Sequence, residues 1–99
     1  MITEIVRIPV DAARVQEFLR VYEQASAAYY ARPGCLSNRL YHSDEEPGIL
    51  VGIVEWDSLD AHKEALHSAV GEQFLQAIGP LTTQFPDVKF YQPAVTGTA

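Results

Sequence analysis

The apolar run ILVGIVEW at residues 49–56 constrains the fold of this chain more than any other stretch. Its β-branched residues, preceded by the turn signal Pro47-Gly48, predict a β-strand. Side chains alternate between the two faces of a strand, and here both sets are apolar: Ile49, Val51 and Ile53 on one face, and Leu50, Gly52, Val54 and Trp56 on the other. A strand of this kind needs cover on both sides.

A helix is predicted behind Asp11, whose carboxylate can accept amide hydrogens of a first helical turn. The residues expected to face the core recur at helical spacing: Val15, Phe18, Leu19, Tyr22, Ser26 and Tyr29. Pro33 disfavours helical geometry in Arg32, and Gly34 permits a sharp turn. The helix is therefore expected to end within the segment ARPGC.

Three further strands are predicted from short segments rich in β-branched or aromatic residues: 2–8, 35–43 and 87–94. The polar segment DEEPG at 44–48 is expected to join two of the strands as a hairpin. We expect one domain over 1–95, followed by a loose tail at 96–99.

A second helix is predicted directly after Trp56, with Asp57 or Ser58 as its cap. We expect Gly71 to interrupt this helix and Gly79-Pro80 to stop it. The resulting order, βαββαβ, predicts an α+β, ferredoxin-like fold in which a four-stranded antiparallel sheet carries its helices on one face.

Helices on one face leave the second apolar face of the strand at 49–56 uncovered. A large exposed apolar patch is unusual in a monomer, and a second copy of the same sheet is the economical cover. A homodimer with two-fold symmetry is therefore predicted.

The overall composition disfavours several classes of protein. A formal charge of −6, with seven basic residues that form no run, disfavours binding to nucleic acid. No apolar stretch reaches the roughly 18 residues of a membrane span, and MITEIVRIPV lacks the features of a signal peptide. Because Cys35 is the single cysteine, no internal disulfide is possible, and the cytoplasm is the expected compartment.

Two of the three histidines lie on the second predicted helix. His62 and His67 lie about 140° apart around the helix axis, so they cannot hold one metal ion together. His62 is expected to face the sheet near Trp56, where it could accept or donate a proton. The alternative is a half-buried histidine bonded to a backbone carbonyl. His67 and His42 are expected at the surface.

Trp56 is either a core residue or the flat wall of a pocket for a planar ligand. Tyrosines could add hydroxyl groups to the same cavity: Tyr22, Tyr29, Tyr41 and Tyr91. The strand register decides which of two pairs shares the face of the tryptophan, and the sequence leaves both open: Arg39 with Tyr41, or Asn38 with His42.

No segment matches a site for a nucleotide or a flavin, because a phosphate-cradling glycine loop and a dinucleotide fingerprint are both missing. Cys35 lies beside a turn, without a helix N-terminus or a clear basic partner, so a catalytic thiolate is not expected. The acids around 55–60 are explained by the start of a helix. We therefore expect no cofactor and no metal.

The segment RPGCLSNRLYHSDEEPGILVGIVEWDSLDAH resembles the antibiotic biosynthesis monooxygenase (ABM) domain family. Its marks are Pro33-Gly34 before a strand, the acidic hairpin ending in Pro47, and above all VEWDSLDA, where a tryptophan ends a strand ahead of a capped helix. VKFYQPA is also similar to the last strand of the family. The likeness spans residues 2–94.

The resemblance implies a dimeric α/β barrel with a cavity between sheet and helices in each subunit. Some members of the family oxidise aromatic polyketides or quinols with molecular oxygen and no cofactor; others degrade haem or isomerise a sugar derivative. Trp56 matches the family tryptophan, and His62 stands where some members carry a tyrosine. We therefore expect His62 to be catalytic, and the substrate to contact a mostly apolar set: Trp56, Gly52, Leu50, Tyr29, Leu66 and Phe74.

Several positions depart from the family pattern. Histidines that many members carry nine and fourteen residues after the tryptophan are Ala65 and Val70 here. The first strand has no asparagine, and no histidine follows His67, which disfavours haem degradation. Gly52 stands where a polyketide-oxidising member of the family has an asparagine, and this difference implies a larger cavity with one hydrogen-bond donor fewer.

The expected function is cofactor-independent oxidation, with molecular oxygen, of a small aromatic hydroxy compound of quinol or polyketide type. Two alternatives stay open. One is a small-molecule-binding dimer without catalysis, and the other is an isomerase or lyase of a small carbonyl compound.

Overall fold

A computed structural model describes residues 1–97 of the chain. Its elements follow the predicted βαββαβ order: β1 (Ile2–Pro9), α1 (Val15–Tyr30), β2 (Cys35–His42), β3 (Ile49–Trp56), α2 (Leu59–Leu66), α3 (Ala69–Ile78) and β4 (Asp87–Tyr91). Short 3₁₀ helices at Ala12–Arg14 and Gly79–Leu81 precede α1 and follow α3. The predicted tail at 96–99 lies partly outside the described residues.

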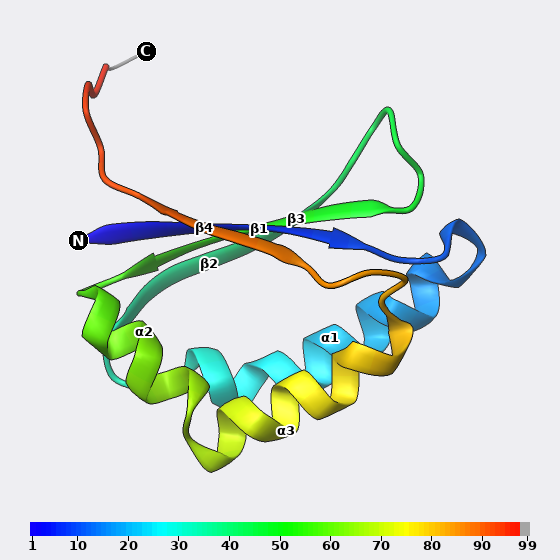
Figure 1. Ribbon diagram of the computed structural model, residues 1–99, viewed down its shortest axis with the longest axis horizontal. Helices are drawn as coiled ribbons and strands as arrows, with labels where there is room; N and C mark the ends of the chain where they lie inside the picture. Colours follow the sequence, from blue (N-terminus) through cyan, green and yellow to red (C-terminus); the bar gives the residue numbers. More distant parts are fainter. Residues whose placement is uncertain (98–99) are drawn as a thin grey trace.

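The strands form one antiparallel sheet in the order β2-β3-β1-β4. In residues 1–97 the helices all cover the same face of this sheet, and α1 and α3 pack against each other (Figure 1). The core lies between the two layers, and its largest fully buried side chains are Trp56, Phe18, Leu50 and Val54. The predicted α+β, ferredoxin-like architecture is confirmed.

The register of β2 against β3 settles which side chains share the face of Trp56. Asn38 and His42 pair with Val54 and Leu50, whose side chains point to the same face of the sheet as Trp56. Arg39 and Tyr41 point to the opposite face. Asn38 and His42 are nevertheless exposed, because β2 is an edge strand and its polar side chains extend to the rim of the sheet.

Side-chain caps set the starts of the first two helical segments. Asp11 accepts a hydrogen bond of 2.9 Å from the amide of Ala13, at the 3₁₀ turn that leads into α1. Ser58, rather than Asp57, caps α2 by accepting a hydrogen bond of 3.1 Å from the amide of Ala61.

The predicted helix break at Gly71 is wrong. The helix α2 ends at Leu66, and Ser68 starts α3 by accepting a hydrogen bond of 3.2 Å from the amide of Gly71. Gly71 is buried in the first turn of α3, where a Cβ atom would lie 2.5 Å from the carbonyl oxygen of Leu66. The serine therefore makes the break, and the glycine permits the close approach of the two helices.

The last strand is shorter than predicted. It ends at Tyr91 instead of reaching 94. Pro93 has no amide hydrogen to donate to a sheet, which explains why pairing does not continue.

The sheet face that carries no helix in residues 1–97 is partly apolar (Figure 1). Ile5, Val51 and Ile53 are half-buried on neighbouring strands of this face. Tyr41 and Tyr91 lie on the same face, and each is 47% exposed. We call this surface the open sheet face.

Candidate functional site

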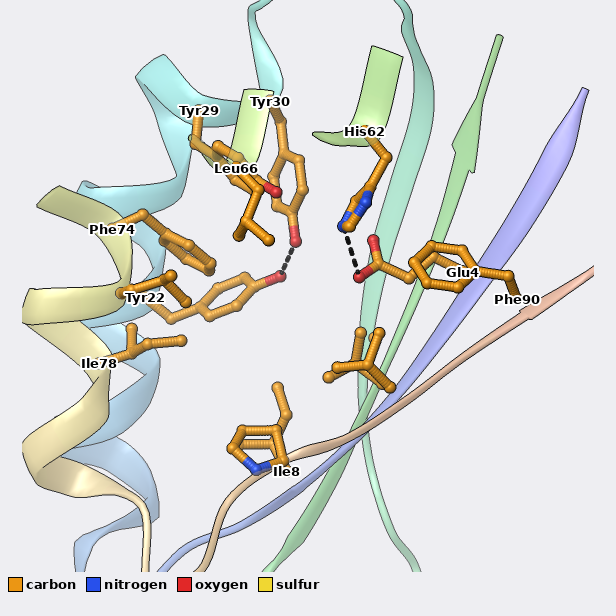
Figure 2. A pocket seen from close by; sticks show the side chains of 15 residues that line it. Glu4, Ile8, Tyr22, Tyr29, Tyr30, His62, Leu66, Phe74, Ile78 and Phe90 are labelled. Carbon is orange, nitrogen blue, oxygen red and sulfur yellow. Dashed lines mark hydrogen bonds and ion pairs between the residues drawn. The ribbon is translucent and has the colours of Figure 1, made fainter. Parts of the chain in front are cut away.

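A cavity of about 400 Å³ lies between the sheet and the helices (Figure 2), a size suited to a small molecule. Most of its lining residues are apolar: Val6, Ile8, Gly52, Leu66, Phe74, Leu75, Ile78, Pro86, Val88 and Phe90. The other lining residues carry polar groups: Glu4, Tyr22, Tyr29, Tyr30 and His62.

A buried carboxylate, Glu4, stands at one side of the cavity. Its Oε1 accepts a hydrogen bond of 2.9 Å from the indole Nε1 of Trp56. Its Oε2 lies 3.3 Å from Nε2 of His62. Glu4 and His62 are each only 6% exposed. A carboxylate at such a depth needs hydrogen bonds or an opposite charge to offset its lost hydration, and these two donors supply them.

Local structure explains why these groups meet. The side chain of Glu4 points from β1 toward the helices. Glu4 pairs with Val54 of β3 on one side and with Phe90 of β4 on the other. Ser58 fixes the start of α2 directly after β3. One turn further on, this start brings His62 over the same part of the sheet.

Glu4 is the residue of the candidate site that the sequence analysis missed. It lies on the same face of its strand as Ile2, Val6 and Ile8, where an apolar side chain is expected. Because glutamate is almost never buried unless it is paired, an acid in that phase indicates a buried partner. The sequence offers this signal, but it does not say which residue the partner is.

His62 packs between two aromatic rings, with its ring centroid 5.3 Å from that of Trp56 and 4.8 Å from that of Phe90. A neutral imidazole that donates from Nε2 to Glu4 keeps a lone pair on Nδ1. This Nδ1 is buried and has no hydrogen-bond partner among residues 1–97. The side chain is thus held by a carboxylate, rather than by the backbone carbonyl that we considered as the alternative.

Trp56 is fully buried and does not line the cavity. Its ring packs against Tyr29 and His62, with centroids 6.0 and 5.3 Å away. Other side chains cover the face that was expected to stack on a planar ligand, and the indole N–H is directed at Glu4. The tryptophan is therefore connected to the cavity through the carboxylate, and not through its own ring.

Five of the predicted site residues do meet at the cavity: His62, Tyr29, Gly52, Leu66 and Phe74. Leu50 is fully buried in the core and, like Trp56, is not part of the lining. It points from β3 toward the helices, but the layer above it is closed by packed side chains. His42 and His67 are exposed, as predicted.

Two tyrosines of α1 form a second polar group in the cavity wall. The hydroxyl oxygens of Tyr22 and Tyr30 are 2.8 Å apart and share a hydrogen bond. Figure 2 shows the two hydroxyls pointing toward each other, and the Tyr22 side chain pointing toward the side of the cavity where His62 and Glu4 lie. Burial raises the pKa of both phenols, and the nearby charge of Glu4 raises it further. Both are therefore neutral hydroxyl groups near neutral pH.

The remaining tyrosines divide between the two faces of the sheet. Tyr29 stacks on Phe74 in the cavity wall, with ring centroids 4.8 Å apart and planes inclined by 12°. Tyr41 and Tyr91 lie on the open sheet face and cannot serve the cavity. The sequence analysis did not consider Tyr30, because it lies one residue beyond the predicted helical stripe.

Within residues 1–97, no group of three His, Cys, Asp or Glu side chains is placed to hold a metal ion. Burial raises the pKa of the Cys35 thiol, which keeps it in its less nucleophilic form. No helix in the same part of the chain is long and apolar enough to cross a bilayer.

Fold and site together define an α+β protein with a small-molecule cavity and a buried carboxylate–imidazole pair. The family model for antibiotic biosynthesis monooxygenases (ABM) matches residues 1–81. The chain therefore belongs to the ABM family. A search of curated protein sequences finds no match.

Solved structures share this fold over nearly the whole chain. A proposed antibiotic biosynthesis monooxygenase from Bordetella bronchiseptica is 26% identical, with a TM-score of 0.87, over 95% of this chain and 97% of that one. A similar protein from Caulobacter crescentus is 25% identical, with a TM-score of 0.85, over 95% and 90% of the two chains. A point mutant of SnoaB, a cofactor-independent oxygenase from Streptomyces nogalater, is 25% identical, with a TM-score of 0.81, over 96% and 94%.

Proposed function

We propose that this protein is a cofactor-independent monooxygenase that oxidises a small aromatic hydroxy compound of quinol or polyketide type. The observation that carries the proposal is the Glu4–His62 pair, a buried proton acceptor at the wall of a mostly apolar cavity. The similarity to SnoaB, which is described as a cofactor-independent oxygenase, supports the same reaction class.

The first step is removal of a proton from the substrate. The proton goes to the free lone pair on Nδ1 of His62, and the resulting imidazolium is paired with the Glu4 carboxylate 3.3 Å from its Nε2. His62 keeps its predicted catalytic role in this proposal, and Glu4 joins it because both side chains line the cavity. A positioned base of this kind typically contributes about 10²–10⁴-fold to a rate.

The electron-rich anion then reacts with molecular oxygen. One electron passes from the anion to oxygen, and the resulting radical and superoxide combine to form a carbon–oxygen bond. Cleavage of the peroxide O–O bond leaves a carbonyl group and hydroxide, which takes the stored proton from Glu4–His62 and becomes water. A CH₂ group and O₂ thus give C=O and H₂O, so the substrate itself is the reductant.

The apolar lining suits this sequence of steps. It excludes water from a reactive anion, and it strengthens the electrostatic interactions of the few polar groups that remain. In this proposal the substrate contacts Tyr29, Gly52, Leu66 and Phe74, which all line the cavity. Trp56 takes part by holding Glu4.

We also propose a homodimer with two-fold symmetry, formed through the open sheet face. Ile5, Val51 and Ile53 are half-buried there, on the side of the sheet away from the helices (Figure 1). A second copy of the same face would remove these side chains from water, and its symmetry makes the contact self-complementary.

Isomerisation of a small carbonyl compound is the second candidate function. It would use the same proton acceptor, and the neutral hydroxyls of Tyr22 and Tyr30 favour it because they could stabilise an enolate oxygen. This reaction needs no oxygen, so oxygen uptake separates the two candidates.

The test is a screen of purified protein against phenols, quinols and anthrones, with oxygen consumption and product mass as readouts. We expect one atom of labelled oxygen in the product, and a strong loss of turnover in Glu4→Gln. Turnover without oxygen uptake would favour the isomerase. Tight binding without any turnover would favour a non-catalytic binding protein.

A further inference from the structure

The ring of Phe90 packs against His62, and the proposed proton transfer gives it no role. We infer that Phe90 is a positioning residue: together with Trp56 it fixes the plane of the His62 imidazole, so that one edge of the ring stays on Glu4. The inference rests on the proposed function for the purpose that a fixed ring serves, namely to hold a proton acceptor in place. The positioning itself is open to measurement without any substrate.

The hydrogen bond to Glu4 does not by itself fix the orientation of the imidazole. Nε2 of His62 lies 3.3 Å from the carboxylate, whereas the buried Nδ1 has no hydrogen-bond partner within residues 1–97. The torsion that turns a histidine ring about its Cβ–Cγ bond has broad minima. Rotation about this bond also carries Nε2 away from the carboxylate. Contacts on the flat faces of the ring are therefore needed to limit the rotation.

The order of the strands places one aromatic side chain on each side of Glu4. The strand β1, which carries Glu4, lies between β3 and β4. Trp56 ends β3, and Phe90 of β4 is the register partner of Glu4. Register partners direct their side chains to the same face of a sheet, and Figure 2 shows Phe90 on the same side of the cavity as Glu4 and His62. The imidazole that reaches Glu4 from α2 therefore has one aromatic ring on either side.

Both aromatic contacts have the edge-to-face geometry that such rings prefer. The ring of Phe90 lies 4.8 Å from that of His62, with planes inclined by 66°. The ring of Trp56 lies 5.3 Å away, with planes inclined by 79°. A quarter turn of the imidazole would lose this geometry at both rings. A half turn would keep the shape but put Cε1 in the place of Nε2, and Glu4 would lose its donor. The aromatic rings and the carboxylate thus exclude different wrong orientations.

Phe90 is the member of this arrangement that can be changed alone. Trp56 also holds Glu4 through its hydrogen bond of 2.9 Å, so its replacement disturbs the carboxylate as well as the imidazole. Phe90 is partly buried and lines the cavity, and it makes no hydrogen bond through its side chain. Its replacement therefore removes a contact with the imidazole and leaves the hydrogen bond between Trp56 and Glu4 in place.

The test measures fast motion of the His62 ring by ¹³C relaxation of its Cε1–H bond, in protein with labelled histidine and without substrate. The signal is assigned by its loss in His62→Gln. We expect an order parameter of about 0.85 in the wild type, the value of a rigid backbone, and of less than about 0.6 in Phe90→Leu. Phe90→Tyr keeps an aromatic ring and should restore the rigidity. Phe85→Leu makes the same substitution at a side chain that is 99% exposed and should leave the His62 ring rigid.

Backbone order parameters of α2 separate positioning from a loosened fold. They should be unchanged in Phe90→Leu, and a fall along the whole helix would overturn the inference, because Phe90 would then support α2 and not the imidazole. A His62 ring that is mobile in the wild type, or that stays rigid in Phe90→Leu, also overturns it and leaves the proposed function untouched. If Phe90→Leu does not fold, Phe90→Met, whose flexible side chain fills irregular space, gives the same readout. Failure to find an oxidised substrate would count against the proposed function alone, since the motion of the ring is measured without one.

Discussion

The indole Nε1 of Trp56 donates a hydrogen bond of 2.9 Å to Oε1 of Glu4, and so joins the end of β3 to the helix-facing side of β1. The other carboxylate oxygen is left for His62, at 3.3 Å. Both oxygens of the carboxylate are therefore fixed by the protein before any substrate is present. Preorganisation of this kind costs no rearrangement when charge develops during a reaction.

Trp56→Phe should reveal the value of this hydrogen bond, because it keeps an aromatic ring and removes the indole N–H. A hydrogen bond to a charged group contributes about 1.5–3 kcal/mol, so we expect the free energy of unfolding to fall by about this amount. Turnover should fall as well, since Glu4 loses its fixed orientation. Urea unfolding and oxygen uptake measure the two effects.

The control for this prediction is the same substitution in a Glu4→Gln background. There the indole no longer faces a charged acceptor, so Trp56→Phe should cost less stability than it does in the wild type. An equal cost in both backgrounds would mean that the ring, and not its bond to Glu4, supplies the stability.

His62→Gln is expected to separate the chemical role of the side chain from its structural role. The amide of glutamine can still donate to Glu4, so the melting temperature should change little, but it cannot take up a proton. Turnover should therefore fall by about 10²–10⁴-fold. His67→Gln makes the same change at the exposed end of α2 and should leave turnover unchanged. Full activity in His62→Gln would assign the proton acceptor to Glu4 alone.

Local features explain why much of this fold could be predicted from the sequence. Alternation in β3 and the helical stripe of α1 are short-range patterns, and caps such as Asp11 act within one turn. The site depends on long-range register instead. Glu4 and His62 meet only because β1 lies between β3 and β4, and no local pattern encodes that pairing.

The predictions for Trp56 and Gly71 were wrong for the same reason: at each position a tertiary contact, which the sequence does not show, decides the structure. Trp56 was expected to face a ligand because its strand position and flat ring suit a pocket wall, but the buried acid beside it decides where the indole points. Gly71 was expected to break a helix because glycine is a weak helix former. Its real constraint is a backbone contact with the previous helix, which only the three-dimensional structure shows.

Gly71→Ala should be destabilising for that reason. A Cβ atom there would lie 2.5 Å from the carbonyl oxygen of Leu66, so either α2 or α3 must shift. Overpacking of this kind typically costs about 1–3 kcal/mol. Gly79→Ala is the matched control, because nothing lies within 4 Å of a Cβ atom at that position. Equal melting temperatures for the two variants would contradict the close approach of the helices.

Ile53→Lys tests the proposed homodimer. Ile53 lies on the open sheet face, where a buried and unpaired charge would be strongly unfavourable in an interface. Sedimentation velocity should show a dimer for the wild type and a monomer for the variant. Gln76→Lys places the same charge on the exposed surface of α3 and should stay dimeric. A wild-type protein that is monomeric at high concentration would rule out the interface.

The last prediction concerns the cost of separating Tyr22 from Tyr30. Their hydroxyls are each other's hydrogen-bond partners at 2.8 Å, so Tyr22→Phe or Tyr30→Phe leaves one buried hydroxyl without its partner. An unpaired buried group typically costs about 1–3 kcal/mol, whereas removal of both partners is nearly neutral. Each single variant should therefore unfold at lower urea concentration than the wild type, and the double variant should recover most of the loss. A loss of stability in the double variant equal to the sum of the two single-variant losses would show that the phenols do not stabilise each other. Each hydroxyl would then have its own partner in solution.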